Sequence, residues 1–277
     1  MQPIGQPTGK APARRPRVLV VANQKGGVGK TTTAINLGTA LAAVGQPTLV
    51  MDMDPQGNAS TGLGVHRPDR KVTTYDVLMG EARLADAVMP TRIPGLSLVP
   101  STVDLSGAEL ELIDVQRRNY RLKDAIEVYA ASDESPFSYI LIDCPPSLTL
   151  LTVNAMCAAD AVVVPLQCEF FALEGLTQLL NTIERVRQNL NPALEIQGVV
   201  LTMFDKRNNL SDQVAADVRE HLGDKVYRTI IPRNVRISEA PSHGLPALVY
   251  DLRCPGSQAY IKLAGELIQR ERARLAA

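Results

Sequence analysis

The sequence lacks any apolar run long enough to cross a membrane, and its cysteines are few and scattered. No stretch approaches the roughly 18 consecutive apolar residues that a membrane-spanning helix needs, and residues 1–16 lack the apolar core of a signal peptide. No C-x-x-C pair occurs, so neither a disulfide framework nor a zinc site is indicated by the four cysteines, Cys144, Cys157, Cys168 and Cys254. We therefore expect a cytosolic protein with reduced thiols.

Net charge and aromatic side chains are also scarce. The formal net charge at pH 7 is zero, and aromatic residues make up 4% of the chain. A neutral molecule has no overall electrostatic attraction for nucleic acid. The basic segments contain no interleaved aromatic residues that could stack on bases, and no recognition helix is visible. Any contact with DNA is therefore expected to be local and directed at phosphate.

Residues 1–16 are rich in proline and glycine and contain almost no apolar side chains. Such a segment cannot bury enough surface to offset the entropy of ordering, so we predict a disordered tail. The tail is basic, and its positive charges either contact nucleic acid or simply keep the tail solvated. The remaining residues, 17–277, are within the size range of one undivided α/β domain.

From residue 17 onward, short apolar runs alternate with helical patterns. Nearly continuous Val, Ile and Leu is typical of strands buried on both faces of a parallel sheet, and the runs lie at 18–22, 48–53, 96–100, 139–143, 161–166 and 196–203. Helices are expected between them at 31–44, 106–130, 172–189, 211–222 and 257–274. The pattern predicts a doubly wound, mostly parallel sheet with right-handed crossovers, flanked by helices in a single domain.

A glycine-rich loop at 23–32 directly follows the first apolar run. In the phosphate-loop pattern G-x-x-x-x-G-K-[ST], backbone N–H groups wrap the phosphates, the lysine reaches the β and γ phosphates, and the hydroxyl binds Mg²⁺. Gly29-Lys30-Thr31 match this pattern, although Gln24 occupies the first glycine position. Gly26 and Gly27 still supply a permissive backbone, and the expected helix directs its N-terminal dipole at a bound phosphate. The strand, loop and helix together favour a phosphate site over a glycine-rich turn with a solvated lysine.

The loop also contains a second lysine, Lys25, five positions before Lys30. A residue this early in the loop sits at its outer lip and points away from its own nucleotide. If Lys25 acts on a phosphate, that phosphate belongs to another subunit. The alternative is a surface lysine that only raises the local positive potential.

Acidic residues follow two of the predicted strands. Asp52 and Asp54 stand at the end of the run 48–53 and just after it, and they point to the same face because side chains alternate along an extended segment. Two carboxylates beside a phosphate site suggest one for the metal shell and one for the attacking water. Asp143 ends the run 139–143, where an aspartate can hold Mg²⁺ through water opposite the Thr31 hydroxyl. Because ligands of open α/β sheets bind at the carboxyl ends of strands, both acidic motifs lie where a bound ligand is expected.

The loop, written K-G-G-V-G-K-T-T, resembles the deviant Walker A motif of the ParA/MinD family of dimerising phosphate-loop ATPases. The resemblance implies that Lys25 reaches across a nucleotide sandwich and that Asp54 promotes hydrolysis, while Asp52 and Asp143 serve the outer shell of Mg²⁺. It also implies an ATP-binding loop in which Lys30 contacts the β and γ phosphates and Thr31 the metal, formed by Lys25, Gly26, Gly27, Val28, Gly29, Lys30, Thr31 and Thr32.

Segments 165–175 and 231–242 extend the similarity to the chromosomal ParA/Soj branch. In that branch Pro232 and Asn234 match positions around the adenine, and Arg207 and Arg236 match positions associated with non-specific DNA contact. The resemblance implies an ATP-dependent homodimer on the nucleoid, with weak intrinsic ATPase activity that a ParB-type centromere-binding partner stimulates. Chromosome or plasmid segregation would be its function, with hydrolysis releasing DNA.

Three other functions are considered. A MinD-like membrane-associated positioning ATPase needs a C-terminal amphipathic helix with bulky apolar residues, and residues 268–277 contain few. An iron–sulfur carrier needs closely paired cysteines. A plasmid-type partition ATPase with its own operator-binding domain needs an N-terminal helix-turn-helix, which residues 1–16 cannot form.

Overall fold

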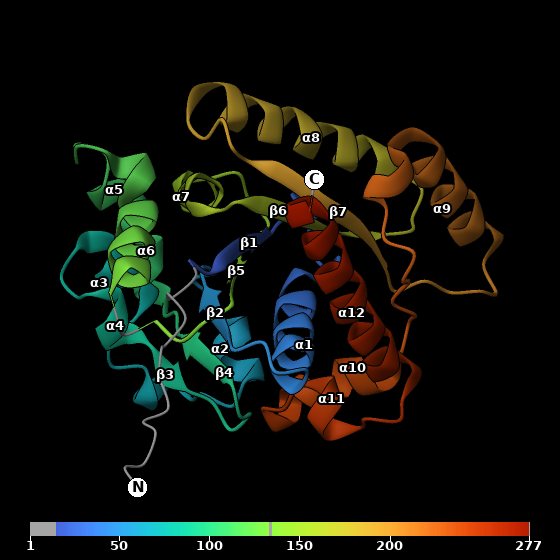
Figure 1. Cartoon of the computed structure of the whole chain (residues 1–277), viewed down its shortest axis with the longest axis horizontal. Coiled ribbons are helices and arrows are strands. Elements are labelled where there is room, and N and C mark those ends of the chain that lie inside the picture. Colours follow the sequence, from blue (N-terminus) through green and yellow to red (C-terminus); the bar gives the residue numbers. More distant parts are fainter. Residues whose placement is uncertain (1–14, 133–134, 277) are drawn as a thin grey trace, which may run out of the picture.

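The computed structural model of the protein describes residues 15–132 and 135–276. Most of the predicted tail, residues 1–14, lies outside the described residues, so its disorder stays a prediction. The described chain folds around one sheet with helices on both sides (Figure 1).

Seven strands form this sheet: β1 Arg17–Val21, β2 Thr48–Asp52, β3 Met89–Pro90, β4 Leu96–Val99, β5 Tyr139–Asp143, β6 Ala161–Gln167 and β7 Glu195–Thr202. Their order is β3-β4-β2-β5-β1-β6-β7. Neighbouring strands run parallel except for β3, which pairs antiparallel with β4 at one edge. The predicted doubly wound, mostly parallel sheet is confirmed. Strand β3 was not predicted, because a strand of two residues leaves no recognisable pattern in the sequence.

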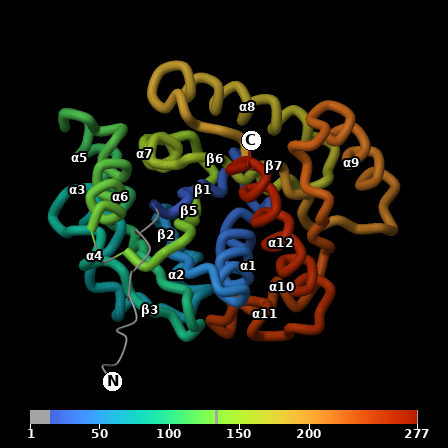
Figure 2. Tube along the Cα trace, in the orientation of Figure 1, coloured from blue at the N-terminus to red at the C-terminus, as the bar shows by residue number. Residues whose placement is uncertain are grey.

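Helices cover both faces of the sheet, and Figure 2 shows α1 and α12 side by side on one of them. Helices α3 to α9 contribute to the hydrophobic core on the other face. The bounds are α1 Lys30–Ala43, α2 Asn58–Gly62, α3 Thr74–Met79, α4 Leu84–Ala87, α5 Ala108–Glu111, α6 Arg121–Ala131, α7 Leu150–Ala158, α8 Ala172–Asn189, α9 Asn209–Leu222, α10 Val235–Glu239, α11 Ala247–Tyr250 and α12 Pro255–Ala276.

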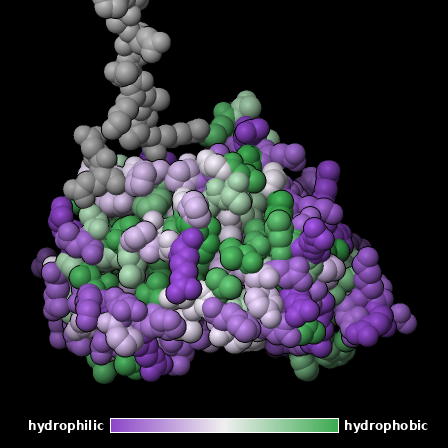
Figure 3. Space-filling model, turned by 90° about the horizontal axis from the view of Figure 1, so that it is seen from below, coloured by the Kyte–Doolittle hydropathy of each residue, from purple (hydrophilic) through white to green (hydrophobic). Residues whose placement is uncertain are grey.

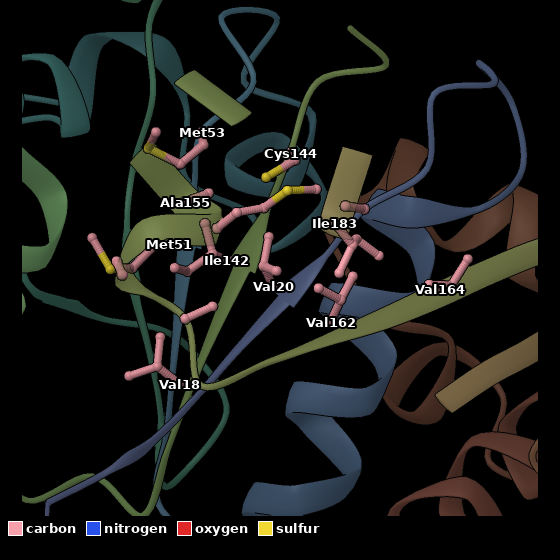
Figure 4. Close-up of a cluster of buried hydrophobic side chains, with 14 of the residues drawn as sticks. Val18, Val20, Met51, Met53, Ile142, Cys144, Ala155, Val162, Val164 and Ile183 are labelled. Carbon is pink, nitrogen blue, oxygen red and sulfur yellow. The ribbon is translucent and has the colours of Figure 1, made fainter. Parts of the chain in front are cut away.

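Alternating residues of the central strands build the two cores. Val18 and Val20 of β1 point to the face that α7 and α8 cover, together with Met51, Ile142 and Val162 (Figure 4). The intervening residues of the same strands pack against α1 and α12 on the opposite face. Because both faces are buried, the inner positions of β1, β2 and β5 are all apolar and polar residues stand at the strand ends, which explains the continuous apolar runs in the sequence.

The single helix predicted at 106–130 is wrong. The chain forms the short helix α5, turns, and starts again as α6, with Arg117 between them in the left-handed region at φ +57°. Asn154 of α7 stabilises the new start, since its side chain donates to the Arg118 carbonyl at 2.8 Å and accepts from the Leu122 amide at 3.3 Å. This contact comes from a distant part of the sequence, so the local periodicity could not reveal the break.

The outer surface is mixed in character. Figure 3 shows one face, on which hydrophobic side chains lie between hydrophilic ones that gather toward the edges. Within the two described ranges, no helix combines the length and apolarity that a membrane crossing requires.

Candidate functional site

The loop between β1 and α1 has the backbone that phosphate binding requires. Gly27 and Gly29 have φ angles of +75° and +89°, which side-chain-bearing residues rarely adopt. Gly29 is the N-cap of the 14-residue helix α1, and its carbonyl accepts from the Thr33 amide at 2.9 Å. The positive end of the helix dipole therefore meets the loop and favours an anion there.

Hydrogen bonds to neighbouring strands brace this loop. Asn23 donates to the Pro165 carbonyl at 2.7 Å and accepts from the Lys25 amide at 3.0 Å. Thr202, at the end of β7, donates to the Val28 carbonyl at 2.8 Å. The ends of β6 and β7 thus hold the loop in shape from one side.

Lys30 is almost buried inside the loop. Its side chain nitrogen donates to the Lys25 carbonyl at 3.0 Å. Burial lowers the pKa of Lys30, and the nearby carboxylates of Asp143 and Asp54 oppose that shift. A buried ammonium with one neutral acceptor gains strongly from an approaching phosphate.

A cavity of about 920 Å³ opens beside the loop. It brings together segments that are far apart in the sequence, including the loop, the end of β2 and the stretch before α10. The predicted residues that line it are Gly26, Gly27, Gly29, Lys30, Thr31, Thr32, Asp54, Pro232 and Asn234. Val28 instead packs its side chain in the interior, so only its backbone can serve a ligand.

Other residues that line the cavity were not predicted as site residues. Gln56 and Asn58 continue the segment after Asp54, and their position beside two aspartates was an available signal. Met203 adopts φ +48°, a strained conformation that only the structure reveals. Tyr260 comes from α12 and bonds Thr33 through its hydroxyl at 3.2 Å. Nothing local in the sequence marked it.

Asp143 is the carboxylate with unmet bonding capacity. Both of its oxygens are buried and have no partner at hydrogen-bond geometry among the described residues, although the Thr31 hydroxyl lies near enough to oppose the rise of its pKa. Burial, and then the neighbouring Asp52, raises the pKa of Asp143 well above its usual range. Buried polar atoms are rarely left unsatisfied in native proteins, so these oxygens fit a site for hydrated metal.

Asp52 pairs in register with Asp143, but its oxygens are already engaged. One oxygen accepts from the Ser60 amide and hydroxyl, at 2.8 and 2.6 Å, and the other accepts from the Asp54 amide at 3.2 Å. Burial raises the pKa of Asp52 to about 6, although the Ser60 bonds oppose the shift. In this structure Asp52 holds helix α2 and does not line the cavity, and its role toward metal stays a prediction.

Asp54 lies in the loop after β2 and lines the cavity. One oxygen accepts from the Gln56 amide at 2.9 Å, and the other accepts no hydrogen bond from the described residues. Gly57 follows with φ +64°, and a Cβ there would strike the buried guanidinium of Arg70. The turn therefore holds Asp54 toward the cavity by a conformation that glycine allows.

Within residues 15–132 and 135–276, no three His, Cys, Asp or Glu side chains form a cluster able to hold a metal by themselves. Magnesium in nucleotide sites uses one or two protein ligands and completes its shell with phosphate and water. Thr31 in the cavity and the unsatisfied Asp143 suit that mode.

Lys25 does not line the cavity. Its ammonium forms an ion pair of 2.6 Å with Glu169, which lies between β6 and α8, and both side chains are roughly half exposed. The structure thus places Lys25 at the lip of the loop, and its action on a second subunit stays a prediction.

Arg207 and Arg236 lie on adjacent segments at the β7 edge of the sheet. A parallel bridge between Phe204 and Pro232 joins these segments. Arg207 is exposed and pairs with Asp205 at 2.7 Å. Arg236 pairs with Glu239 at 2.9 Å. Both arginines are accessible, but each would have to exchange a carboxylate for a phosphate.

Comparisons with known proteins agree with this geometry. A family model described as an AAA domain matches residues 16–196. The chromosome partitioning protein ParA of Caulobacter vibrioides is 68% identical over 260 residues, covering 94% of this chain and 97% of the relative. The sporulation initiation inhibitor protein Soj of Bacillus subtilis is 50% identical over 251 residues, covering 91% of this chain and 98% of the relative.

A solved structure with the same fold carries ligands. The crystal structure of cobyrinic acid a,c-diamide synthase from Mycobacterium smegmatis, with bound ATP analog and magnesium, has a TM-score of 0.80 and 37% identity, covering 93% of this chain and 96% of that one. Given the loop, the strand-end aspartates and the near full-length identity to ParA and Soj, this chain belongs to the ParA/Soj family of chromosome-partitioning ATPases.

Proposed function

We propose that this protein is an ATP-dependent switch ATPase that dimerises, binds DNA without sequence preference and drives chromosome segregation with a ParB-type partner. The observation that carries the proposal is the convergence of Lys30, Asp54 and Asp143 at the carboxyl ends of adjacent strands around one phosphate loop. The names of the ParA and Soj relatives support the segregation role. The neighbouring structure with ATP analog and magnesium supports ATP and Mg²⁺ as ligands.

Each residue at the site has a defined part in nucleotide binding. The loop amides from Gly26 to Thr32 wrap the phosphates, and Lys30 turns from the Lys25 carbonyl toward the β and γ phosphates. Pro232 and Asn234 border the cavity where the adenine is expected. Asn234 also caps α10 by accepting from the Arg236 amide at 3.0 Å, which fixes its position.

Magnesium would be held by the Thr31 hydroxyl and, through water, by Asp143, and it would neutralise charge on the phosphates. Asp54 would orient the attacking water through its free carboxylate oxygen. Asp52 would keep α2 and the Asp54 loop in place through Ser60. Hydrolysis would be slow without the ParB-type partner, as suits a switch.

Dimerisation would place Lys25 on the phosphates of the second subunit. A Cβ at Gly26 or Gly27 would meet no heavy atom of the described residues within 4 Å apart from the adjoining residues of the loop. Packing within the subunit therefore does not require Gly26 to lack a side chain. Close approach of nucleotide or of a second subunit supplies a reason for it.

Replacing Lys25 by alanine tests the dimer. ATP binding by the monomer is expected to stay within about twofold, because Lys25 does not line the cavity. ATP-dependent dimerisation is expected to fall at least roughly 30-fold, since the loss leaves phosphate charge unpaired at a closed interface. Light scattering with ATP measures the dimer, and Lys71→Ala, at an exposed lysine away from the cavity, is the control. A Lys25→Ala protein that dimerises like the parent would disprove the action in trans.

DNA binding is proposed to run through Arg207 and Arg236. Formal net charge is zero, so a local cluster has to supply the attraction. Two copies in a dimer would double the cluster and raise the avidity, so that ATP controls DNA affinity through assembly. Binding to phosphates would place the dimer on the nucleoid.

Reversing the charge at Arg207 or Arg236 to glutamate is expected to weaken DNA binding roughly tenfold or more at low salt and to make the salt dependence shallower. ATPase activity without DNA should change little. Arg92→Glu is the matched control, because Arg92 is exposed in the turn between β3 and β4 at the opposite edge of the sheet. Unchanged affinity across a salt series would show that Arg207 and Arg236 are ordinary surface charges.

The membrane-associated alternative finds no support in α12. This helix packs Leu263 and Leu267 into the core against α1, so its apolar side is used inside the fold. Leu275 near its end is exposed, but a single leucine does not make an amphipathic anchor.

A further inference from the structure

Lys25 is restrained inside its own subunit by Glu169, which lies just before α8. We propose that Glu169 is a positioning residue that holds Lys25 in the free monomer and has to release it before two subunits can join. This inference rests on the proposed dimer, in which Lys25 acts on the phosphates of a second copy.

The carboxylate of Glu169 is itself held from several directions. Its Oε2 pairs with the Lys25 ammonium at 2.6 Å, and its Oε1 accepts a hydrogen bond from the side chain of Gln167. The Glu169 carbonyl accepts from the Ala172 amide at 2.9 Å, which ties it to the first turn of α8. A carboxylate near the N-terminus of an 18-residue helix is also favoured by the helix dipole. Glu169 thus has a second side-chain partner in Gln167 and a backbone bond to α8, whereas the Lys25 ammonium has Glu169 as its one partner among the described residues.

A second restraint acts on the backbone of Lys25. Its carbonyl accepts a hydrogen bond from the ammonium of Lys30 at 3.0 Å, and that ammonium donates to no other group of the described residues. When Lys30 turns toward phosphate, this bond is given up and the Lys25 peptide is less restrained. Loss of this bond on nucleotide binding would leave the Lys25 backbone with its amide bond to Asn23 at 3.0 Å and would ease the exchange of Glu169 for the phosphate of a partner.

The ion pair has a strength that suits a restraint of this kind. Both side chains are roughly half exposed, and exposed pairs contribute little to stability. A phosphate at a closed interface is a stronger partner for an ammonium, because it is sheltered from water. The pair therefore favours the monomer without locking it. Since a dimer breaks two such pairs, removing Glu169 is expected to lower the dimer dissociation constant by roughly 2- to 30-fold.

A purely structural role for Glu169, bridging the loop to α8, predicts something different. In that case the loss of its charge would loosen the fold and would not favour the dimer. Glu169→Gln separates the two roles, because the amide keeps the size of the side chain and can still bond Gln167. Glu174→Gln is the matched control, since Glu174 is exposed on the first turn of the same helix and its substitution removes the same charge.

Two measurements on the full-length protein test the proposal. The first is the acetylation rate of Lys25 by a water-soluble N-hydroxysuccinimide ester in the nucleotide-free monomer, read by peptide mass spectrometry. We expect this rate to rise severalfold in Glu169→Gln and not in Glu174→Gln. The second is sedimentation with a non-hydrolysable ATP analogue, in which Glu169→Gln should dimerise more tightly than the parent.

Each result decides a separate point. Equal labelling of Lys25 in the parent and in Glu169→Gln would overturn the restraint, whether or not the protein dimerises. Faster labelling with a weaker dimer would also overturn it, because Glu169 would then act across the interface. If the parent and Lys25→Ala proteins both fail to dimerise with the analogue, the proposed dimer fails, while the labelling still judges the restraint.

Discussion

Lys30→Ala is expected to weaken ATP binding at least about 100-fold and with it to abolish ATP-dependent dimerisation and DNA binding. The reason is the burial of the ammonium, which has one neutral acceptor among the described residues, the Lys25 carbonyl at 3.0 Å. In the loaded site the same ammonium would face phosphate charge in a sheltered cavity, where such interactions are strong. Few other side chains in the cavity could replace it.

The measurement is calorimetric or fluorescent titration of the monomer with ATP and Mg²⁺. Circular dichroism should show that Lys30→Ala stays folded, because removing a buried cation whose pKa is already lowered leaves the two strand cores intact. Lys71→Ala, at an exposed lysine outside the cavity, is expected to bind ATP like the parent. Near-normal affinity in Lys30→Ala would mean that the loop is not the phosphate site.

Local sequence was sufficient to predict features that depend on neighbouring residues along the chain. The buried strands are continuous in Val, Ile and Leu because helices cover both faces, and that composition is visible without any structure. The glycines at 27 and 29 appear in the pattern because only their backbone makes the turn. Helix α8, Ala172–Asn189, has the predicted bounds, because its apolar periodicity is also a local feature of the sequence.

Features that depend on distant contacts could not be predicted. The break between α5 and α6 is held by Asn154, more than thirty residues further along the chain. The partner of Lys25 is Glu169, which lies beyond five intervening strands, and nothing in the loop indicates it. Tyr260 enters the cavity because α12 packs on α1. In each case the signal is a tertiary contact between side chains that the sequence places far apart.

Asp52 shows a subtler limit of sequence reasoning. Alternation along a strand places Asp52 and Asp54 on one face, and it suggests equivalent access to the nucleotide. The strand ends between them, so Asp54 reaches the cavity while Asp52 is enclosed by Ser60 at 2.6 Å. Two identical side chains thus acquire different surroundings, and only one of them is free to act on water.

Asp54→Ala is expected to reduce ATP hydrolysis about 100-fold or more while leaving ATP binding and dimerisation in place. Asp54 contributes a carboxylate to the cavity, but it accepts no hydrogen bond from the amides of residues 26–32, which we propose hold the phosphates. A subunit that binds ATP and cannot hydrolyse it should remain in the dimer, and therefore on DNA. The two measurements are the rate of phosphate release and the retention of the protein on DNA after ATP is removed.

Asp54 also shapes its own loop by accepting from the Gln56 amide at 2.9 Å, so alanine alone cannot separate chemistry from structure. Asp54→Asn keeps an acceptor for that amide and removes the charge. If the carboxylate orients water, both variants should be locked on DNA, because neither can assist the removal of a proton. If only alanine locks the dimer, the turn is what matters. Asp69→Asn, at an exposed aspartate outside the cavity, should turn over ATP like the parent, and rapid turnover in Asp54→Asn would remove Asp54 from the mechanism.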